Sequence, residues 1–210
     1  MKSLVKSKMK NKIIYIWDYY RLKIAFAIIG IAITISIINS VTHNTEKDLY
    51  IGFVNVTMGT DLRNYLIEST SLEISAYEDL LLADTSTSGN IEYTLASQAK
   101  ILGAIETNKL DLVILDEDSF AAFSQNGYLW DIKDYINSNC PSIAGELEEC
   151  YEKNIDLTDE SNPVEYYSGI NLNSNQTVKD AAFNGNIYLA IIKNTERIDS
   201  INQYLLYLYQ

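Results

Sequence analysis

The chain has 210 residues and a formal net charge of −12, and its only histidine is His43. The acidic balance argues against nucleic-acid binding, because that affinity depends on Lys and Arg neutralising phosphates. With a single histidine there is no well-placed base for Ser-His-Asp or Cys-His catalysis, and the usual His or clustered Cys zinc sites are disfavoured. We therefore expect no catalytic activity, no metal site and no cofactor.

Basic residues gather at the start of the chain, before an apolar run. Residues 1–23 contain seven Lys or Arg and one acid, and residues 24–38 contain only two polar side chains, Thr34 and Ser36. Extended to residue 42, the run approaches the roughly 20 residues that cross a bilayer, and its basic flank favours a cytoplasmic N-terminus. We predict a basic cytoplasmic segment (1–23), a transmembrane anchor in the lipid bilayer of the cell membrane (24–42) and an extracytoplasmic domain (43–210). A cleaved signal peptide and a buried soluble helix are the alternatives, although no A-x-A-like cleavage site follows the run.

The first part of the outer domain alternates predicted strands and helices. Residues 49–56 (LYIGFVNV) form an apolar run typical of a buried strand, and residues 72–77 alternate polar and apolar side chains as a half-buried strand does. Between them, residues 61–68 have apolar side chains at helical spacing, with Thr60 available as the N-cap. Residues 84–90 have the composition of a loop.

A long amphipathic helix and a buried strand follow this loop. Residues 91–110 place apolar side chains at steps of three and four, which predicts a helix with one face in the core. That face consists of Ile91, Leu95, Ala99, Leu102 and Ile105. Residues 111–116 (DLVILD) are typical of a strand buried on both faces. The order strand, helix, strand, helix, strand predicts an α/β fold, a single three-layer lobe with a mostly parallel sheet.

The second half of the chain gives clearer signals at its ends than in its middle. Asp118 can cap a helix that Gly127 stops, and residues 129–136 resume with an apolar face. Residues 141–164 are acidic with weak periodicity, and residues 171–176 form an Asn-rich linker. The last two predicted elements are a strand at residues 187–192 and a helix at residues 200–209.

The two cysteines, Cys140 and Cys150, fall on the predicted outer side of the membrane, where disulfides form. A bridge between them would close a short loop and add on the order of 3 kcal/mol of stability. Two unpaired thiols are the alternative. Neither arrangement implies catalysis.

Two segments resemble type 2 periplasmic or extracellular solute-binding proteins. Residues 106–136 contain a strand that ends in an acidic turn, then a helix, then the turn GYLWDI. Residues 187–209 are similar to the return strand and helix of that family. The resemblance implies one ligand-binding α/β lobe over most of residues 48–210. The family's second lobe would be inserted within residues 142–179, a stretch too short for it, so the sequence argues against closure of two lobes over a ligand.

Candidate ligand-binding residues lie at the ends of the predicted strands, because open parallel sheets bind ligands outside the carboxyl ends of their strands. Gly59 and Thr60 could present backbone N–H groups to a carboxylate, and the carboxylates of Asp116 and Glu117 could bind a cation or an amine. An ordinary capped turn and a solvated acidic turn are the respective alternatives. The candidates are Asn55, Thr57, Gly59, Thr60, Tyr77, Asp116 and Glu117, with Glu78 and Asp118 beside them.

Three hypotheses about function follow. The first is a non-catalytic, membrane-tethered extracytoplasmic domain, resembling a solute-binding protein, that binds a small molecule or a partner protein. The second is a structural or accessory component of a cell-surface or transport assembly. The third is a carboxylate-dependent hydrolase, which would need two acids at a defined separation that sequence spacing does not show.

Overall fold

The computed structural model describes residues 46–82, 91–180 and 185–209. The chain divides into two compact units, Met1–Glu46 and Lys47–Gln210, and the described residues fall almost entirely in the second. The predicted anchor (24–42) and most of the predicted loop (84–90) lie outside the described residues. Within the described part, no helix is both long and apolar enough to cross a membrane.

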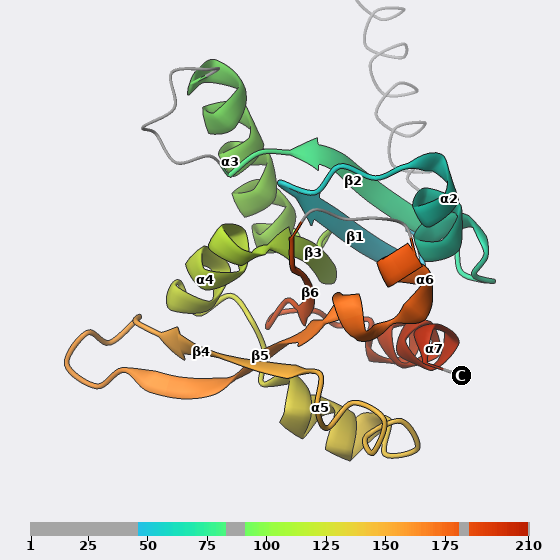
Figure 1. Ribbon diagram of the computed structural model, residues 1–210. Coiled ribbons are helices and arrows are strands. Elements are labelled where there is room, and N and C mark those ends of the chain that lie inside the picture. Colours follow the sequence, from blue (N-terminus) through green and yellow to red (C-terminus); the bar gives the residue numbers. More distant parts are fainter. Residues whose placement is uncertain (1–45, 83–90, 181–184, 210) are drawn as a thin grey trace, which may run out of the picture. The chain divides into compact units, whose positions relative to one another are not determined.

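A six-stranded mixed sheet forms the centre of the described domain (Figure 1). In chain order its strands are β1 (Leu49–Val54), β2 (Ile74–Leu80), β3 (Leu112–Asp116), β4 (Tyr151–Asp156), β5 (Val164–Asn171) and β6 (Ile187–Ile191). Across the sheet they lie in the order β2-β1-β3-β6-β5-β4. β1 is parallel to both β2 and β3, whereas β6 is antiparallel to β3 and β5, and β4 is antiparallel to β5. The prediction of a mostly parallel sheet is therefore wrong, although the α/β class is confirmed.

The antiparallel pairing of β4 with β5 has a local cause, the short connection between the two strands. β4 and β5 are joined by residues 157–163 alone, which is too short for the crossover that parallel neighbours need. β4 lies at the edge of the sheet, and Tyr151 is its only buried residue. It therefore lacks the apolar pattern that predicts a strand. The predicted linker at residues 171–176 instead contains the end of β5, a 3-10 turn η2 (Leu172–Ser174) and the start of α6 (Gln176–Asp180).

Helices cover both faces of the sheet. α2 (Thr60–Arg63) continues directly into a π-helical turn, η1 (Asn64–Glu68). The longer helices are α3 (Ile91–Glu106), α4 (Glu117–Gln125), α5 (Ile132–Asn139) and α7 (Ile198–Leu208). Each of these helices, and each of β1, β2, β3 and β6, forms in a region where the sequence predicted it.

The core consists of two apolar clusters, one on each face of the sheet. In β3, Leu112 and Ile114 belong to one cluster and Val113 and Leu115 to the other, as expected when successive side chains of a strand point to opposite faces. The first cluster includes side chains of η1, α5 and α7, and the second includes side chains of α3 and α4. The sheet thus lies between two helical layers.

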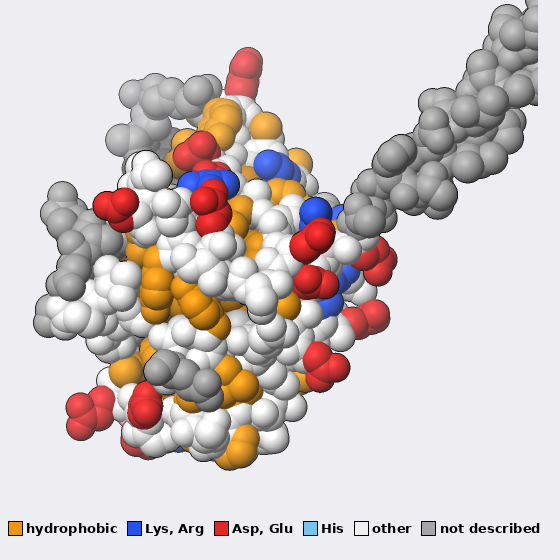
Figure 2. Space-filling view, turned by 90° about the vertical axis from the view of Figure 1, so that its right-hand side faces the viewer, with side chains coloured by type: hydrophobic (Ala, Val, Ile, Leu, Met, Phe, Trp, Pro, Cys, Tyr) orange, Lys and Arg blue, Asp and Glu red, His pale blue; other side chains and the backbone are white. Residues whose placement is uncertain are grey.

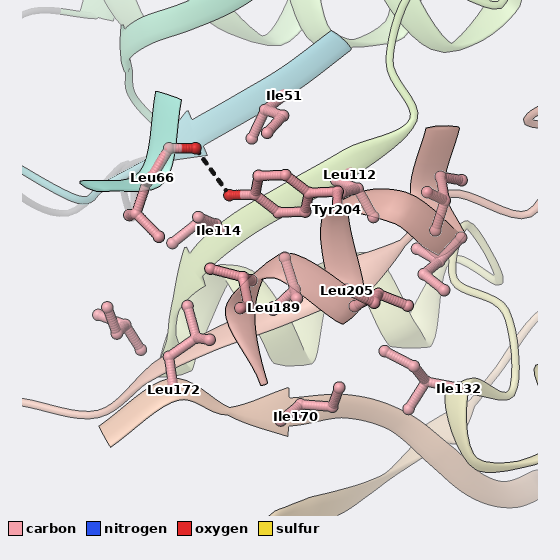
Figure 3. Packing of buried hydrophobic residues seen from close by; sticks show 14 of the residues in the cluster. Ile51, Leu66, Leu112, Ile114, Ile132, Ile170, Leu172, Leu189, Tyr204 and Leu205 are labelled. Carbon is pink, nitrogen blue, oxygen red and sulfur yellow. Dashed lines mark hydrogen bonds between the residues drawn. The ribbon is translucent and has the colours of Figure 1, made fainter. Parts of the chain in front are cut away.

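Tyr204 anchors α7 in the first cluster. Its side chain is fully buried close to Leu112 and Ile114, and its hydroxyl donates to the backbone oxygen of Leu66 at 2.9 Å (Figure 3). Burial of the phenol raises its pKa well above the usual value near 10. The hydrogen bond links α7 to η1, so the aromatic side chain contributes both apolar contact and a satisfied polar group.

α3 forms where the sequence predicted a helix, but it turns a different face to the sheet. Ile91, Leu95 and Leu102 are 61%, 59% and 46% exposed, and Ala99 is exposed as well. The buried side chains are Thr94, Ser97, Ile101, Ala104 and Ile105. The predicted core face is therefore wrong except at Ile105. Three of the five buried side chains are small, and small side chains at a contact let a helix approach its neighbour closely.

Two helix starts differ slightly from prediction. Asp116, and not Asp118, is the N-cap of α4, and its Oδ1 accepts a hydrogen bond from the Ser119 backbone at 2.9 Å. Gly59, and not Thr60, is the N-cap of α2. The predicted stop after α4 is confirmed, because Gly127 has a φ of 67°, in the left-handed region that glycine favours.

Candidate functional site

Asn55 joins the carboxyl ends of the three parallel strands. Its Nδ2 donates to the Leu82 backbone oxygen at 3.1 Å and to Asp116 Oδ2 at 3.2 Å, and its Oδ1 accepts from the Leu82 backbone nitrogen at 2.9 Å. Asn55 has a φ of 56°, a conformation that Asn tolerates better than most residues. Because Asp116 also caps α4, these polar groups satisfy one another and hold the strand ends together.

The other predicted site residues do not converge on Asn55 and Asp116. Thr57, Gly59, Thr60 and Glu117 are exposed, and a Cβ added at Gly59 would meet nothing within 4 Å, so no close approach requires glycine there. Tyr77 stacks on Tyr50, with ring centroids 6.5 Å apart, and lies beneath the Lys100 amino group. The pKa of Tyr77 is raised, first because its phenol is partly buried and second because Tyr50 lies nearby. The structure thus brings together only two of the seven candidates.

A small apolar cleft opens between α3 and α4, next to this strand-end group. Its volume is about 160 Å³. Its lining consists of Leu82, Gln98, Ile101, Leu102, Ala122, Phe123, Asn126 and Tyr128. Leu82 belongs to both features, because its backbone binds Asn55 while the residue lines the cleft.

An exposed apolar stripe of α3 leads into the cleft. Ile91, Leu95 and Leu102 are separated by four and seven residues, so they lie on one face of the helix, with Gln98 between the last two. Leu102 is both an exposed member of this stripe and part of the lining of the cleft. We call Ile91, Leu95, Leu102 and the cleft together the α3 surface. The sequence identified these apolar residues but assigned them to the core.

The surface of the domain is strongly acidic. Residues 1–45 hold seven of the 16 basic residues and one of the 28 acids, so the rest of the chain carries nine basic residues against 27 acids. Several of the basic residues are already paired, as Arg63 is with Glu68 and Glu78, and Lys133 is with Glu148. Figure 2 shows acidic side chains spread over the visible face, with basic side chains in few places. Such a surface attracts cationic partners and repels anionic ones.

A buried ion pair, which no sequence pattern predicted, lies at the opposite end of β3. Asp111 is fully buried, and its carboxylate accepts hydrogen bonds from the Tyr50 backbone at 2.9 Å and the Thr195 hydroxyl at 2.6 Å. Arg197 Nη1 lies 3.3 Å from Asp111 Oδ1 and donates to the Asn108 backbone oxygen at 2.6 Å. Because both carboxylate oxygens are occupied by partners within the fold, we assign this network to the connection between β1, β3 and the start of α7.

Both cysteines are free thiols in the structure, and the disulfide remains a prediction from the sequence alone. Cys140 is buried and donates to Asn202 Oδ1 at 3.3 Å, and its burial raises the pKa of its thiol. Cys150 is half-buried. Over the residues that the structure describes, no group of three or more His, Cys, Asp or Glu side chains is placed to hold a metal ion.

Comparison with known proteins finds no matching family model, no matching curated protein and no matching solved structure.

Proposed function

We propose that this chain is a non-catalytic binding domain, tethered outside the cell membrane by residues 24–42, which binds a partner protein through the α3 surface. The observation that carries the proposal is the outward position of Ile91, Leu95 and Leu102 while Thr94 and Ser97 are buried. Burying one such aliphatic side chain stabilises a protein or a complex by about 1.5–3 kcal/mol. Much of this stabilisation is absent in the free domain and would be gained when a partner covers the side chains. An apolar surface of this kind, surrounded by polar residues, is typical of a protein interaction site.

The size of the cleft favours a protein side chain over a small-molecule ligand. Pockets for drug-sized ligands occupy roughly 300–1,000 Å³. The cleft of about 160 Å³ suits one bulky apolar side chain. Such an anchor in a desolvated pocket commonly supplies much of the energy of a protein interface.

Charge indicates the chemistry of the partner. A second copy of this domain would bring two strongly acidic surfaces together, and like charges placed against each other oppose association. A segment in which Lys or Arg flank one apolar side chain would instead be attracted. We therefore infer that the partner is a protein segment with one apolar anchor side chain flanked by basic residues. Such a segment could belong to a permanent neighbour in a cell-surface assembly.

The resemblance to solute-binding proteins supports the α/β lobe but not capture between two lobes. Residues 142–179, where a second lobe would be inserted, contain β4, β5, η2 and most of α6, and both strands belong to the same sheet as β1. A single lobe with an exposed docking surface fits this arrangement better than a two-lobed clamp.

Peptide selection tests the docking surface directly. Random peptides displayed on phage are selected against the full chain in detergent, and we expect enrichment of peptides with one bulky apolar residue flanked by Lys or Arg. Leu102→Glu should weaken their binding about tenfold or more, because it places a charge at the mouth of the cleft. The matched control is Val164→Glu on β5, where the replaced side chain is 52% exposed.

The same experiment can overturn the proposal. Failure to enrich any peptide relative to the Leu102→Glu chain, or equal weakening by Val164→Glu, would show that α3 is not the docking surface. The tether is tested separately by adding protease to intact cells. Digestion of residues 43–210 supports an external domain, and full protection that ends on lysis contradicts it.

A further inference from the structure

The outer face of α7 forms one wall of a groove that is separate from the α3 surface and is lined by both polar and apolar side chains. Asp199, Asn202, Gln203, Leu206 and Tyr207 follow one another at helical spacing, and all of them line it. The other wall is the segment before β2, residues 70–72. The groove has a volume of about 440 Å³, within the range of small-molecule sites. α7 lies on the right of Figure 1, away from α3 at the upper left.

Asn202 is held with its amide donors available. Its Oδ1 accepts hydrogen bonds from the Tyr135 hydroxyl at 2.9 Å and from Cys140 Sγ at 3.3 Å, both from α5 and its C-cap. These two bonds fix the carboxamide through its oxygen. In the part of the chain that the structure describes, neither Asn202 Nδ2 nor the Asp199 carboxylate has a hydrogen-bonding partner. The groove therefore presents a donor and an acceptor one helical turn apart.

The groove also has a fixed shape and an apolar side. Gln203 Nε2 donates to Ser71 Oγ at 2.7 Å, which joins the two walls. The Tyr207 hydroxyl donates to the Tyr65 backbone oxygen at 2.9 Å, so the ring is held in place. Leu72, Leu206 and Tyr207 are half-buried and add apolar surface beside the polar groups.

We propose that this groove binds a neutral, polyhydroxylated small molecule, such as a mono- or disaccharide. Sugar hydroxyls both donate and accept, so a neighbouring pair can donate to Asp199 and accept from Asn202. The C–H face of a sugar ring can pack on Leu206 and Tyr207. An anionic ligand is disfavoured, because none of the residues that line this groove is Lys or Arg. The acidic surface of the domain would also repel it.

An amine ligand fits less well. A single exposed carboxylate, Asp199, would hold it, and exposed ion pairs contribute only about 0–1 kcal/mol. The amide donors of Asn202 would have no acceptor on an ammonium group. Recognition of hydroxyls, by contrast, uses both residues.

Titration calorimetry with the full chain in a non-glycosidic detergent tests the proposal. The probes are glucose, galactose, mannose, maltose and cellobiose at up to about 10 mM, where a Kd of 1 mM is measurable. We expect at least one saturable interaction. Asp199→Asn should weaken it about tenfold, because the charged acceptor is lost. Asn202→Asp should weaken it similarly, because it keeps an oxygen for Tyr135 and Cys140 but removes the donors.

Two controls separate this site from the rest of the molecule. Asp134→Asn changes an exposed acid of α5 that does not line the groove, and Leu102→Glu changes the α3 surface. Both should leave sugar binding unchanged. Absence of binding by all five sugars, binding that both groove variants leave intact, or preferential binding of ethanolamine would each overturn the inference. None of these outcomes depends on the docking of a protein at α3.

Discussion

α3 and α7 are both amphipathic helices, yet they use their apolar faces in opposite ways. α7 buries Ile201, Tyr204, Leu205 and Leu208 and exposes Asp199 and Gln203. α3 exposes Ile91 and Leu95 and buries Thr94 and Ser97. Helical spacing of apolar residues therefore indicates that a helix forms, but not that its more apolar face is the buried one. The difference matters because an outward apolar stripe is available to a partner.

The largest expected difference between the two helices is the loss of stability when a leucine is replaced by alanine. Leu205→Ala in α7 should lower the free energy of unfolding by about 3 kcal/mol, because it removes buried contacts and leaves a cavity. Leu95→Ala in α3 should change it by about 0.5 kcal/mol or less, since that side chain is largely exposed. Urea unfolding of both variants, followed by circular dichroism, measures the two losses. Equal losses would mean that Leu95 is buried.

Enlarging a small residue tests which face of α3 packs on the sheet. Ser97 is 5% exposed, so Ser97→Leu should overpack the contact and cost about 1–3 kcal/mol of unfolding free energy. Ala96 is exposed, and Ala96→Leu serves as the matched change with little expected effect. If Ala96→Leu were the more damaging substitution, the orientation of α3 described above would be wrong.

Removal of a tyrosine hydroxyl should also cost more stability in α7 than in α3, but the difference should be smaller than for the leucines. Tyr204→Phe leaves the Leu66 carbonyl without its side-chain donor in a buried place, which should cost about 1 kcal/mol. The hydroxyl of Tyr93 in α3 donates to the Asp79 backbone oxygen at 2.7 Å, but it lies at the surface. Water can replace that bond, so Tyr93→Phe should alter stability by less than about 0.5 kcal/mol. Thermal unfolding of both variants provides the comparison, and a larger loss for Tyr93→Phe would contradict it.

The burial of Tyr204 should also make the stability of the domain fall at alkaline pH, where tyrosine ionises. Burial raises the pKa of Tyr204 above its usual value near 10, and burial raises that of Tyr151 to about 12. An unfolded chain ionises these phenols first, so their contribution is complete below pH 10 and is lost as the pH rises above it. Between pH 10 and 11, Tyr204→Phe should lose about 1 kcal/mol less stability than the unaltered chain. Urea unfolding at the two pH values measures the difference, and identical losses would show that Tyr204 is accessible to solvent.

The candidate sites show where sequence reasoning was sufficient and where it was not. The rule that ligands bind at strand ends identified Asn55 and Asp116, which the fold does bring within hydrogen-bonding distance. It also selected Tyr77, whose ring stacks on Tyr50 instead. The groove between residues 70–72 and α7 joins segments more than 120 residues apart in the sequence, and no local pattern indicates that they meet.

The sequence by itself determined the strands and helices whose apolar runs are long or regular, such as β1, β3, β6 and α7, and with them the α/β class. It also determined the separation of a basic N-terminal segment from an acidic remainder. Tertiary structure decided the antiparallel placement of β6 between β3 and β5, the face that α3 turns to the sheet, and the residues that meet in the cleft and the groove. These features depend on contacts between distant segments, and contact with the rest of the fold selects among local arrangements that the chain alone leaves nearly equal.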